Sequence, residues 1–285
     1  MSALANRFSY RGLRKLDGTR PLTEIEMREV APSIFAAEAH ESRSARYSYV
    51  PTVDVLHGLQ AEGFAPFMVC QSTSRIPGKS EFTKHMIRMR HPNQIGKGGA
   101  PEIILLNSHD GTSSYQMLGG WWEFVCQNGL MRGTTGEDIR IKHSGDIIRN
   151  VVEGAHSVLR TLNVMNDQRS DMLALPLPED ARRVFAKAAL ALRYDDDENG
   201  NSKAPIEAER LLQPRRTAEL GDASSLWRTF NIVQENAVRG GLQGRRADNA
   251  RTRTREVKGL DQGVKLNKAL WILAEEMQHI MRKAA

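Results

Sequence analysis

The pattern of apolar and polar positions changes along the chain, from strand-like alternation in the first half to helical spacing in the second. Five β-like runs, separated by Pro, Gly and short polar stretches, follow one another between residues 64 and 145. Short connections of this kind favour antiparallel pairing of neighbouring strands. The alternation therefore predicts a mostly antiparallel sheet of roughly four to six strands.

Helical signals flank the predicted sheet on both sides. Thr23 and Glu26 have the spacing of a capping box and predict a short helix. Thr52 is the expected N-cap of a second helix, which stops near Gly63. Beyond the sheet, apolar side chains recur at helical spacing, first over residues 146–172 and then in several further segments.

These elements predict an α+β protein, in which an N-terminal, mostly antiparallel sheet is backed by a long helix and followed by a helical C-terminal half. Residues 1–175 would form the α+β core with a cationic sheet face, and residues 176–285 a helical region with a basic Gly/Arg loop. The two parts would be either separate domains or one packed unit. In the first helix of the second part, Val184, Ala188 and Leu192 lie along one predicted apolar face.

The composition and charge narrow the class of protein. A formal net charge of +6 and a pI of about 9.4 argue against a mimic of DNA, which would be strongly acidic. No run of about 18 apolar residues and no signal-peptide pattern occur, so we expect no membrane association. Cys70 and Cys126 form no CxxC motif, which favours a cytoplasmic protein, and Cys126 is expected to be a buried small side chain.

Cations alternate with apolar residues in two of the predicted strands. Lys84, Arg88 and Arg90 fall on one face of the first, and Arg140 and Lys142 on one face of the second. Because cations that meet phosphates release condensed counterions, two such faces predict a surface that follows a nucleic-acid backbone. The alternative is an ordinary solvated face of an amphipathic strand.

A second group of cations lies between Arg239 and Lys258. This glycine-rich segment contains seven cations and two acidic residues. The cations are Arg239, Arg245, Arg246, Arg251, Arg253, Arg255 and Lys258. Since a planar guanidinium binds phosphate oxygens in pairs, the segment is predicted to be a loop that clamps a nucleic-acid backbone. The alternatives are a basic loop without a partner and a contact with another subunit.

The residues after the third predicted strand offer candidate chemistry. His109 and Asp110 are possible ligands for a divalent metal, but the sequence HDG also favours a turn in which Asp bonds its own backbone. Trp121 and Trp122 are adjacent and should point to opposite faces, one into the core. The other, for which we select Trp122, would then be free to stack on a base.

Four blocks together resemble the phage- and plasmid-borne proteins that carry the domain of unknown function numbered 932. They are LLNSHDGTSSYQMLGGWWEFVCQNGLM, IRIKHSGDI, FNIVQENAVRGG and TRTREVKGLDQGVKLNKALW. The resemblance extends over about Val50 to Ala274 and implies a mobile genetic element and a cytoplasmic setting, without established catalytic residues. The predicted sheet, long helix and basic groove are also similar in outline to the single-strand annealing proteins of phages.

The leading hypothesis is therefore a non-enzymatic protein that binds single-stranded DNA in phage or plasmid replication or recombination, with annealing as a further candidate activity. No cofactor and no metal are expected. A ring or filament of subunits is expected too, because the C-terminal helix presents an apolar stripe with Trp271 beside it. The alternatives are a metal-dependent nuclease that uses His109 and Asp110, and an inhibitor of a host defence system that acts by protein–protein contact.

Overall fold

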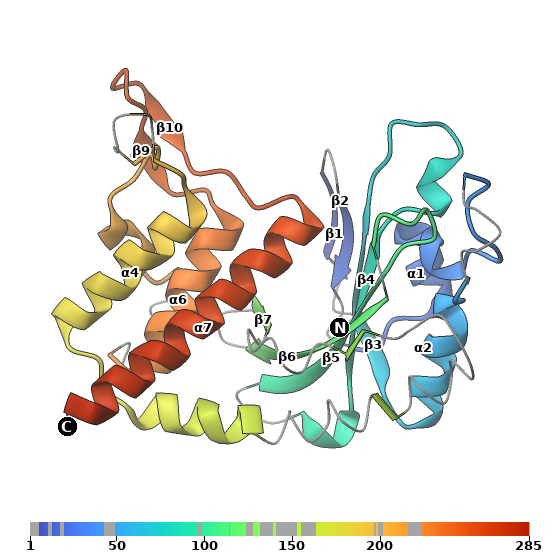
Figure 1. The fold of residues 1–285 in the computed structure, drawn as a ribbon, viewed down its shortest axis with the longest axis horizontal. Coiled ribbons are helices and arrows are strands. Elements are labelled where there is room, and N and C mark those ends of the chain that lie inside the picture. The colour runs from blue at the N-terminus through green and yellow to red at the C-terminus, as the bar shows by residue number, and fades with distance from the viewer. Residues whose placement is uncertain are drawn as a thin grey trace.

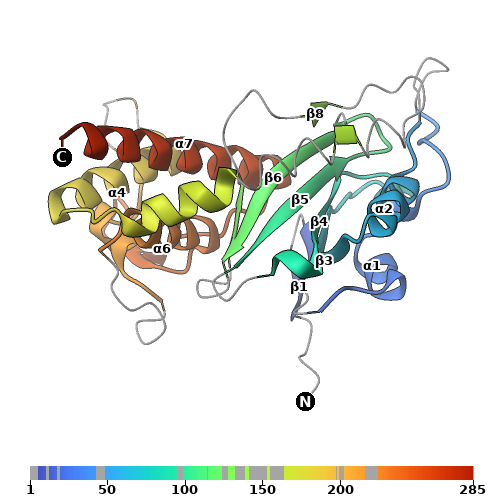
Figure 2. The same ribbon diagram turned by 90° about the horizontal axis from the view of Figure 1, so that it is seen from below.

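The structure is a computed structural model, in which an antiparallel sheet lies between two groups of helices (Figures 1 and 2). It describes residues 6–10, 13–17, 20–42, 49–95, 99–113, 115–123, 128–131, 139–140, 153–154, 164–196, 198, 202–215 and 224–284.

Eight antiparallel strands within the described residues form the main sheet, in the order β1-β2-β3-β4-β5-β6-β7, with β8 beside β6. They are β1 (Asn6–Tyr10), β2 (Leu13–Asp17), β3 (Ala65–Ser72), β4 (His85–Arg90), β5 (Gly99–Asn107), β6 (Gln116–Glu123), β7 (Asn128–Met131) and β8 (Ile139–Arg140). The predicted antiparallel sheet is confirmed. Its N-terminal edge, β1 and β2, was not predicted from the sequence.

Two helices lie between β2 and β3 and the others follow the sheet in the chain, so the predicted α+β class is confirmed. The α-helices are α1 (Glu24–Val30), α2 (Thr52–Ala61), α4 (Glu179–Arg193), α6 (Leu226–Arg239) and α7 (Leu260–Ala284), with a further helix over residues 164–174. Short 3-10 turns are η1 (Pro32–Phe35), η2 (Lys79–Glu81), η3 (Pro92–Gln94) and η4 (Ala208–Leu212). Of the predicted long helix, residues 153–154 and 164–172 are helical, and the rest lies outside the described residues.

The two predicted helix starts differ in outcome. Thr23 caps α1 with a complete capping box, in which the Thr23 side chain accepts from the Glu26 backbone N–H and the Glu26 carboxylate accepts from Thr23. Thr52, however, is the first residue of α2 and Pro51 is its N-cap. The Thr52 hydroxyl is turned instead toward the end of the sheet, where it joins a buried polar network described below.

An aromatic cluster joins the sheet to the C-terminal helices. Trp121 of β6 meets Trp227 of α6 edge to face with ring centroids 6.3 Å apart. Trp227 in turn meets Phe230 at 5.8 Å and Trp271 of α7 at 6.1 Å. These rings belong to one cluster of buried residues that includes side chains from α1, α2, the sheet, α4, α6 and α7. The predicted division near residue 175 stays a prediction, but apolar packing is continuous across it.

Two predicted apolar faces have different outcomes. On α4, Val184 and Leu192 are 58% and 48% exposed, so the predicted face is wrong; the buried face is formed by Phe185, Ala186 and Ala189. On α7, Leu266, Leu270 and Trp271 are buried within the chain. The α7 stripe is therefore intramolecular core, and it gives no support to an assembly of subunits.

Candidate nucleic-acid interface

The basic segment between Arg239 and Lys258 is an ordered β-hairpin. β9 (Gln243–Arg245) pairs with β10 (Arg251–Arg253), and the hairpin stands out beyond α4 and α6 in Figure 1. The backbone N–H of Arg246 donates to the carbonyl of Ala250 at 3.0 Å, and that of Thr254 donates to Leu242 at 2.9 Å. We call residues 243–253 the arginine hairpin. The segment that was predicted to be a glycine-rich loop is thus a hydrogen-bonded β-hairpin over residues 243–253.

The arginine hairpin is attached to the helical half along one edge. The Arg245 backbone N–H donates to the Pro205 carbonyl at 2.7 Å. A Cβ at Gly244 would approach the Pro205 oxygen to 1.9 Å, so only glycine permits this contact. At the base of the hairpin, Arg193 of α4 donates to the carbonyls of Ala237 at 3.2 Å and Arg255 at 3.0 Å. The position of the hairpin is therefore fixed relative to α4 and α6.

Register places two arginines directly opposite each other. Arg245 pairs with Arg251, and Arg253 pairs with Gln243. Because the flanking pairs carry the ladder hydrogen bonds, these are non-hydrogen-bonded pairs, in which opposing side chains lie closest. Like charges directly opposite each other are destabilising. The hairpin therefore carries a local repulsion that a bound anion would relieve.

The hairpin arginines differ in how much of their charge is compensated. Arg246 pairs with Asp248 at 3.7 Å, and the Arg245 guanidinium donates to Asn249, which has a φ of +62° at the tip. Among the described residues, the exposed Arg251 and Arg253 side chains have no ion pair or hydrogen-bond partner. Both guanidinium groups are therefore available to bind an anionic ligand.

The other predicted cations of this segment lie at its ends. Arg239 pairs with the buried Glu235 one helical turn earlier at 3.1 Å, so its charge is largely used inside the protein. Arg255 and Lys258 are exposed on the connecting segment that leads from the hairpin to α7. The structure therefore brings together Arg245, Arg251 and Arg253, with Arg255 close to them along the chain.

A pocket of about 880 Å³ opens beside the arginine hairpin. Its lining includes Arg245, Arg251 and Arg253 of the hairpin, together with Glu207 and with Arg210 of η4. Among the described residues that line it, four guanidinium groups and one carboxylate give a net charge of +3. Nothing in the sequence singles out Arg210, because only the fold brings η4 next to a hairpin more than thirty residues further along the chain.

The predicted cationic face of β4 is wrong for its two arginines. Arg88 and Arg90 are only 2% and 3% exposed, and both bind Glu102 of the neighbouring strand β5. Arg88 Nε donates to Glu102 at 2.5 Å and Arg90 Nε at 2.7 Å, while Arg88 also donates to the Leu130 carbonyl at 2.9 Å. A buried carboxylate holds both cations, so neither reaches a phosphate.

The remaining cations predicted on the sheet are not shown to form a common surface either. Lys84 is mostly buried and binds Asp261 at the start of α7, with Nζ to oxygen distances of 2.6 and 2.7 Å. Arg140 belongs to β8 opposite Gln116, and the structure describes its backbone alone. Lys142 and Cys126 lie outside the described residues.

The two tryptophans point to opposite faces, as predicted. Trp121 is 4% exposed and belongs to the core. Trp122 is half-buried, and the Arg90 guanidinium lies over its ring, 4.7 Å from the centroid. Arg90 also lies 4.6 Å from the Phe67 ring centroid. Arg90 thus occupies one face of the Trp122 ring, and the stacking of a base on Trp122 stays a prediction.

His85, which sequence analysis did not select, lies at the centre of a buried polar network. Ser33 Oγ donates to Gln71 Oε1 at 2.7 Å, so its lone pair faces His85 Nδ1 at 2.9 Å. The Thr83 carbonyl, which only accepts, lies 3.2 Å from the same nitrogen. Both contacts assign the proton to Nδ1, so Nε2 accepts from the Thr52 hydroxyl at 2.9 Å.

The same hydroxyl joins His109 to this network. Thr52 Oγ1 accepts from Asn107 Nδ2 at 2.9 Å and lies 3.3 Å from His109 Nε2. Burial, with a smaller contribution from the charge of His109, lowers the pKa of His85 to about 3. A histidine that stays neutral and fully hydrogen-bonded between α2, β4 and β5 has a structural role, and His109 is part of the same arrangement.

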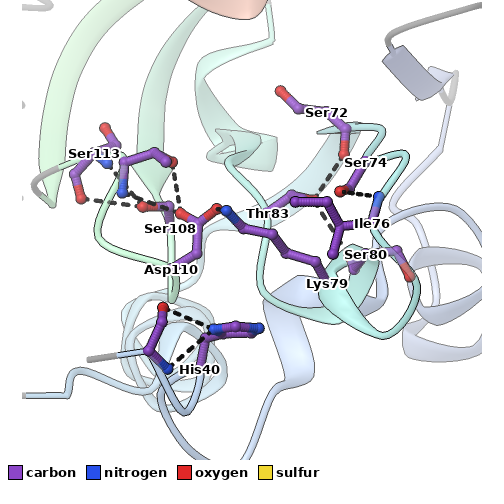
Figure 3. Close-up of polar contacts among 12 residues, drawn as sticks. His40, Ser72, Ser74, Ile76, Lys79, Ser80, Thr83, Ser108, Asp110 and Ser113 are labelled. Atoms are coloured by element: carbon purple, nitrogen blue, oxygen red, sulfur yellow. Dashed lines mark hydrogen bonds and ion pairs between the residues drawn. The ribbon is translucent and has the colours of Figure 1, made fainter.

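Asp110 forms the predicted turn. Its carboxylate accepts from the Thr112 N–H at 3.0 Å and hydroxyl at 2.6 Å, and Gly111 follows with a φ of +74°. Lys79 reaches Asp110 from the β3–β4 connection at 3.4 Å (Figure 3). Burial raises the pKa of Asp110, but the Thr112 hydrogen bonds and Lys79 outweigh it and lower the pKa below its ordinary value. Across the described parts of the chain, no group of three or more His, Cys, Asp or Glu residues could hold a metal ion.

Fold and site together define an α+β protein with an ordered, arginine-rich hairpin beside a cationic pocket. The model of the family described as "Domain of unknown function (DUF932)" matches residues 39–271, and the chain belongs to this family. This confirms the resemblance found in the sequence.

Two relatives from Escherichia coli (strain K12) are similar over nearly their whole length. The chain is 47% identical to UPF0380 protein YafZ and 46% identical to UPF0380 protein YfjQ. Both alignments run over 277 residues, which is 97% of this chain and 98% of each relative. No solved structure matches the chain. In the parts of the chain that the structure describes, no helix has the length and apolarity to cross a bilayer.

Proposed function

We propose that this protein binds nucleic acid through the arginine hairpin, and that its ligand is single-stranded DNA. The observation that carries the proposal is the pair of exposed, uncompensated arginines Arg251 and Arg253 next to Arg245 on a rigid hairpin. Guanidinium groups bind phosphate oxygens in pairs, and each phosphate contact also releases counterions. A fixed hairpin loses little conformational freedom on binding, which favours affinity.

The pocket beside the hairpin favours a single strand over a duplex. A cavity of about 880 Å³ admits a short piece of one strand, whereas a base-paired duplex is too wide to enter it. None of the described residues that line it is aromatic, so contacts would be made to the backbone and not by stacking on bases. Bases left free in this way would remain available for pairing, which supports an annealing role in the replication or recombination of a mobile element.

The proposed mechanism is narrower than the one expected from the sequence. The sheet face no longer contributes Arg88 and Arg90, because both are bound to Glu102. Binding is proposed to be non-enzymatic, cytoplasmic and independent of metal or cofactor. A ring or filament of subunits remains part of the proposal, since one hairpin covers few phosphates and repeated weak sites raise the affinity for a long strand.

Fluorescence anisotropy tests the proposal with a labelled 30-nucleotide single strand and its duplex, each with EDTA and with Mg²⁺. We expect the single strand to bind more tightly, in both buffers, with affinity that falls as salt is raised. Light scattering with the same strand should show association of several protomers. Absence of binding to either DNA at low salt would refute the proposal, and Mg²⁺-dependent cleavage would favour a nuclease that uses His109 and Asp110.

A further inference from the structure

The cationic pocket differs from the exposed hairpin surface in the kind of phosphate that it suits. Arg210 of η4 lines the same pocket as Arg245, Arg251 and Arg253 of the arginine hairpin, so two separate elements supply its guanidinium groups. A volume of about 880 Å³ is within the range of pockets that enclose one small ligand, about 300–1,000 Å³. Its scale is therefore that of roughly one nucleotide and its phosphates.

Charge decides which part of a strand fits best. The described lining residues carry a net charge of +3. Internal phosphodiesters carry one negative charge each, so three successive nucleotides would be needed to match it. A terminal phosphomonoester carries a charge of about −1.5 to −2 at neutral pH, and with the next phosphodiester it approaches −3. One nucleotide at a phosphorylated strand end thus supplies nearly the whole balancing charge.

Glu207 distinguishes the phosphate from the nucleoside part of a ligand. Its carboxylate lines the same pocket as the four arginines, where it would repel phosphates that approach it and accept hydrogen bonds from a sugar or base. The pocket thus has a cationic side for phosphate and an acceptor for the nucleoside. The opposed pair Arg245 and Arg251 gains most from a doubly charged anion, which relieves their repulsion.

We propose that the pocket binds the phosphorylated end of a DNA single strand, with Arg210, Arg245, Arg251 and Arg253 around the terminal phosphate and Glu207 beside the nucleoside. This inference rests on the proposed function. The phosphomonoester chemistry is shared by 5′-phosphate and 3′-phosphate ends, and the experiment has to separate them. The hairpin outside the pocket would then contact the phosphates that follow.

The test compares labelled 12-nucleotide single strands of one sequence that carry a 5′-phosphate, a 3′-phosphate or only hydroxyl ends. Wild-type protein should bind one of the phosphorylated strands roughly tenfold more tightly than the hydroxyl strand, as expected for an added charge-assisted contact. Arg210→Ala should reduce this ratio to near one, and Glu207→Gln should increase the affinity for the phosphorylated strand. Arg183→Ala, which removes an exposed arginine of α4 paired with Glu209, is the matched control and should preserve the ratio.

The outcomes separate the pocket from the proposed function. Equal affinity for all three strands would overturn the pocket inference while leaving single-strand binding intact. No binding to any of them would overturn both. Thermal melting of each variant shows whether it is folded, and Glu207→Gln, which removes a charge without shortening the side chain, decides the matter if Arg210→Ala does not fold. An unchanged ratio in both variants would assign the preference to another site and contradict the inference.

Discussion

Two groups of arginines with the same alternate spacing have opposite surroundings in this protein. Arg88 and Arg90 lie two residues apart on β4, are buried, and share Glu102. Arg251 and Arg253 lie two residues apart on β10, are exposed, and have no compensating acid among the described residues. In both strands the side chains point to one face, so local backbone geometry does not distinguish them.

The difference lies in the neighbouring strand. β5 is buried along its whole length and brings a carboxylate next to the β4 arginines. Met89 pairs with Ile103, and the next residue of each strand, Arg90 and Glu102, forms an ion pair with the other. β9 brings Arg245 opposite Arg251 and adds repulsion. A cationic strand thus becomes a structural ion network or a ligand-binding surface according to the charge of its partner strand.

The largest expected effect comes from removing the shared acid of the buried group. Glu102→Ala removes the carboxylate that both buried guanidinium groups bind and should lower the free energy of unfolding by about 3–5 kcal/mol. Urea denaturation followed by circular dichroism measures this change. Glu276→Ala, at an exposed position of α7, is the control and should have little effect. A loss below 1 kcal/mol for Glu102→Ala would contradict a stabilising role for the ion pairs of Glu102 with Arg88 and Arg90.

A smaller effect is expected from pH, through the neutral His85. Its pKa is about 3 in the folded protein, against an ordinary value near 6.5, so the unfolded chain binds the proton more readily. The contribution of neutral His85 to the free energy of unfolding is fully present above pH 6.5. It falls as pH decreases toward 3, by up to about 1.4 kcal/mol per pH unit. Denaturation at pH 7.5 and 5.0 should therefore differ by about 2 kcal/mol from this residue. His85→Gln should reduce that difference, and an unchanged difference would contradict the assignment of a buried neutral histidine.

The smallest effect on stability is expected in the exposed group. Arg251→Ala, Arg253→Ala and Arg255→Ala combined should change the free energy of unfolding by no more than about 0.5 kcal/mol, since exposed side chains without partners contribute little. Relief of the Arg245–Arg251 repulsion acts in the opposite direction and stabilises the hairpin. Thermal melting beside wild type measures this. A large loss would mean that these arginines support the fold, as Arg88 and Arg90 do.

The sequence predicted the strands and helix starts better than it predicted which neighbouring elements cover them. Alternation identified the antiparallel strands, and the Thr23–Glu26 spacing identified a real capping box. Exposure could not be read from one strand alone, because it depends on which element covers each face. The acid Glu102 within an otherwise apolar strand was the one available signal that a buried cation would be nearby.

The candidate site shows the same limit. The charge of the segment from Arg239 to Lys258 was visible in the sequence, whereas its hairpin register and its contact with Pro205 were not. Arg210 entered the site only through tertiary packing. The α4 face was assigned wrongly because apolar residues at helical spacing lie on both the buried and the exposed side of that helix.

The salt dependence of single-strand binding tests the central claim most directly. For wild-type protein, the logarithm of the association constant should fall linearly with the logarithm of salt concentration, by about 0.7 per phosphate contact. The Arg251→Ala, Arg253→Ala, Arg255→Ala triple variant should bind more weakly, with a slope reduced by about two units. The control replaces Arg20, Arg28 and Arg282 by Ala and removes the same net charge. These three exposed arginines lie outside the arginine hairpin, and each forms an ion pair with an acidic residue. A reduced slope in the hairpin variant alone is the predicted result, and equal slopes in wild type and the hairpin variant would contradict a phosphate-binding hairpin.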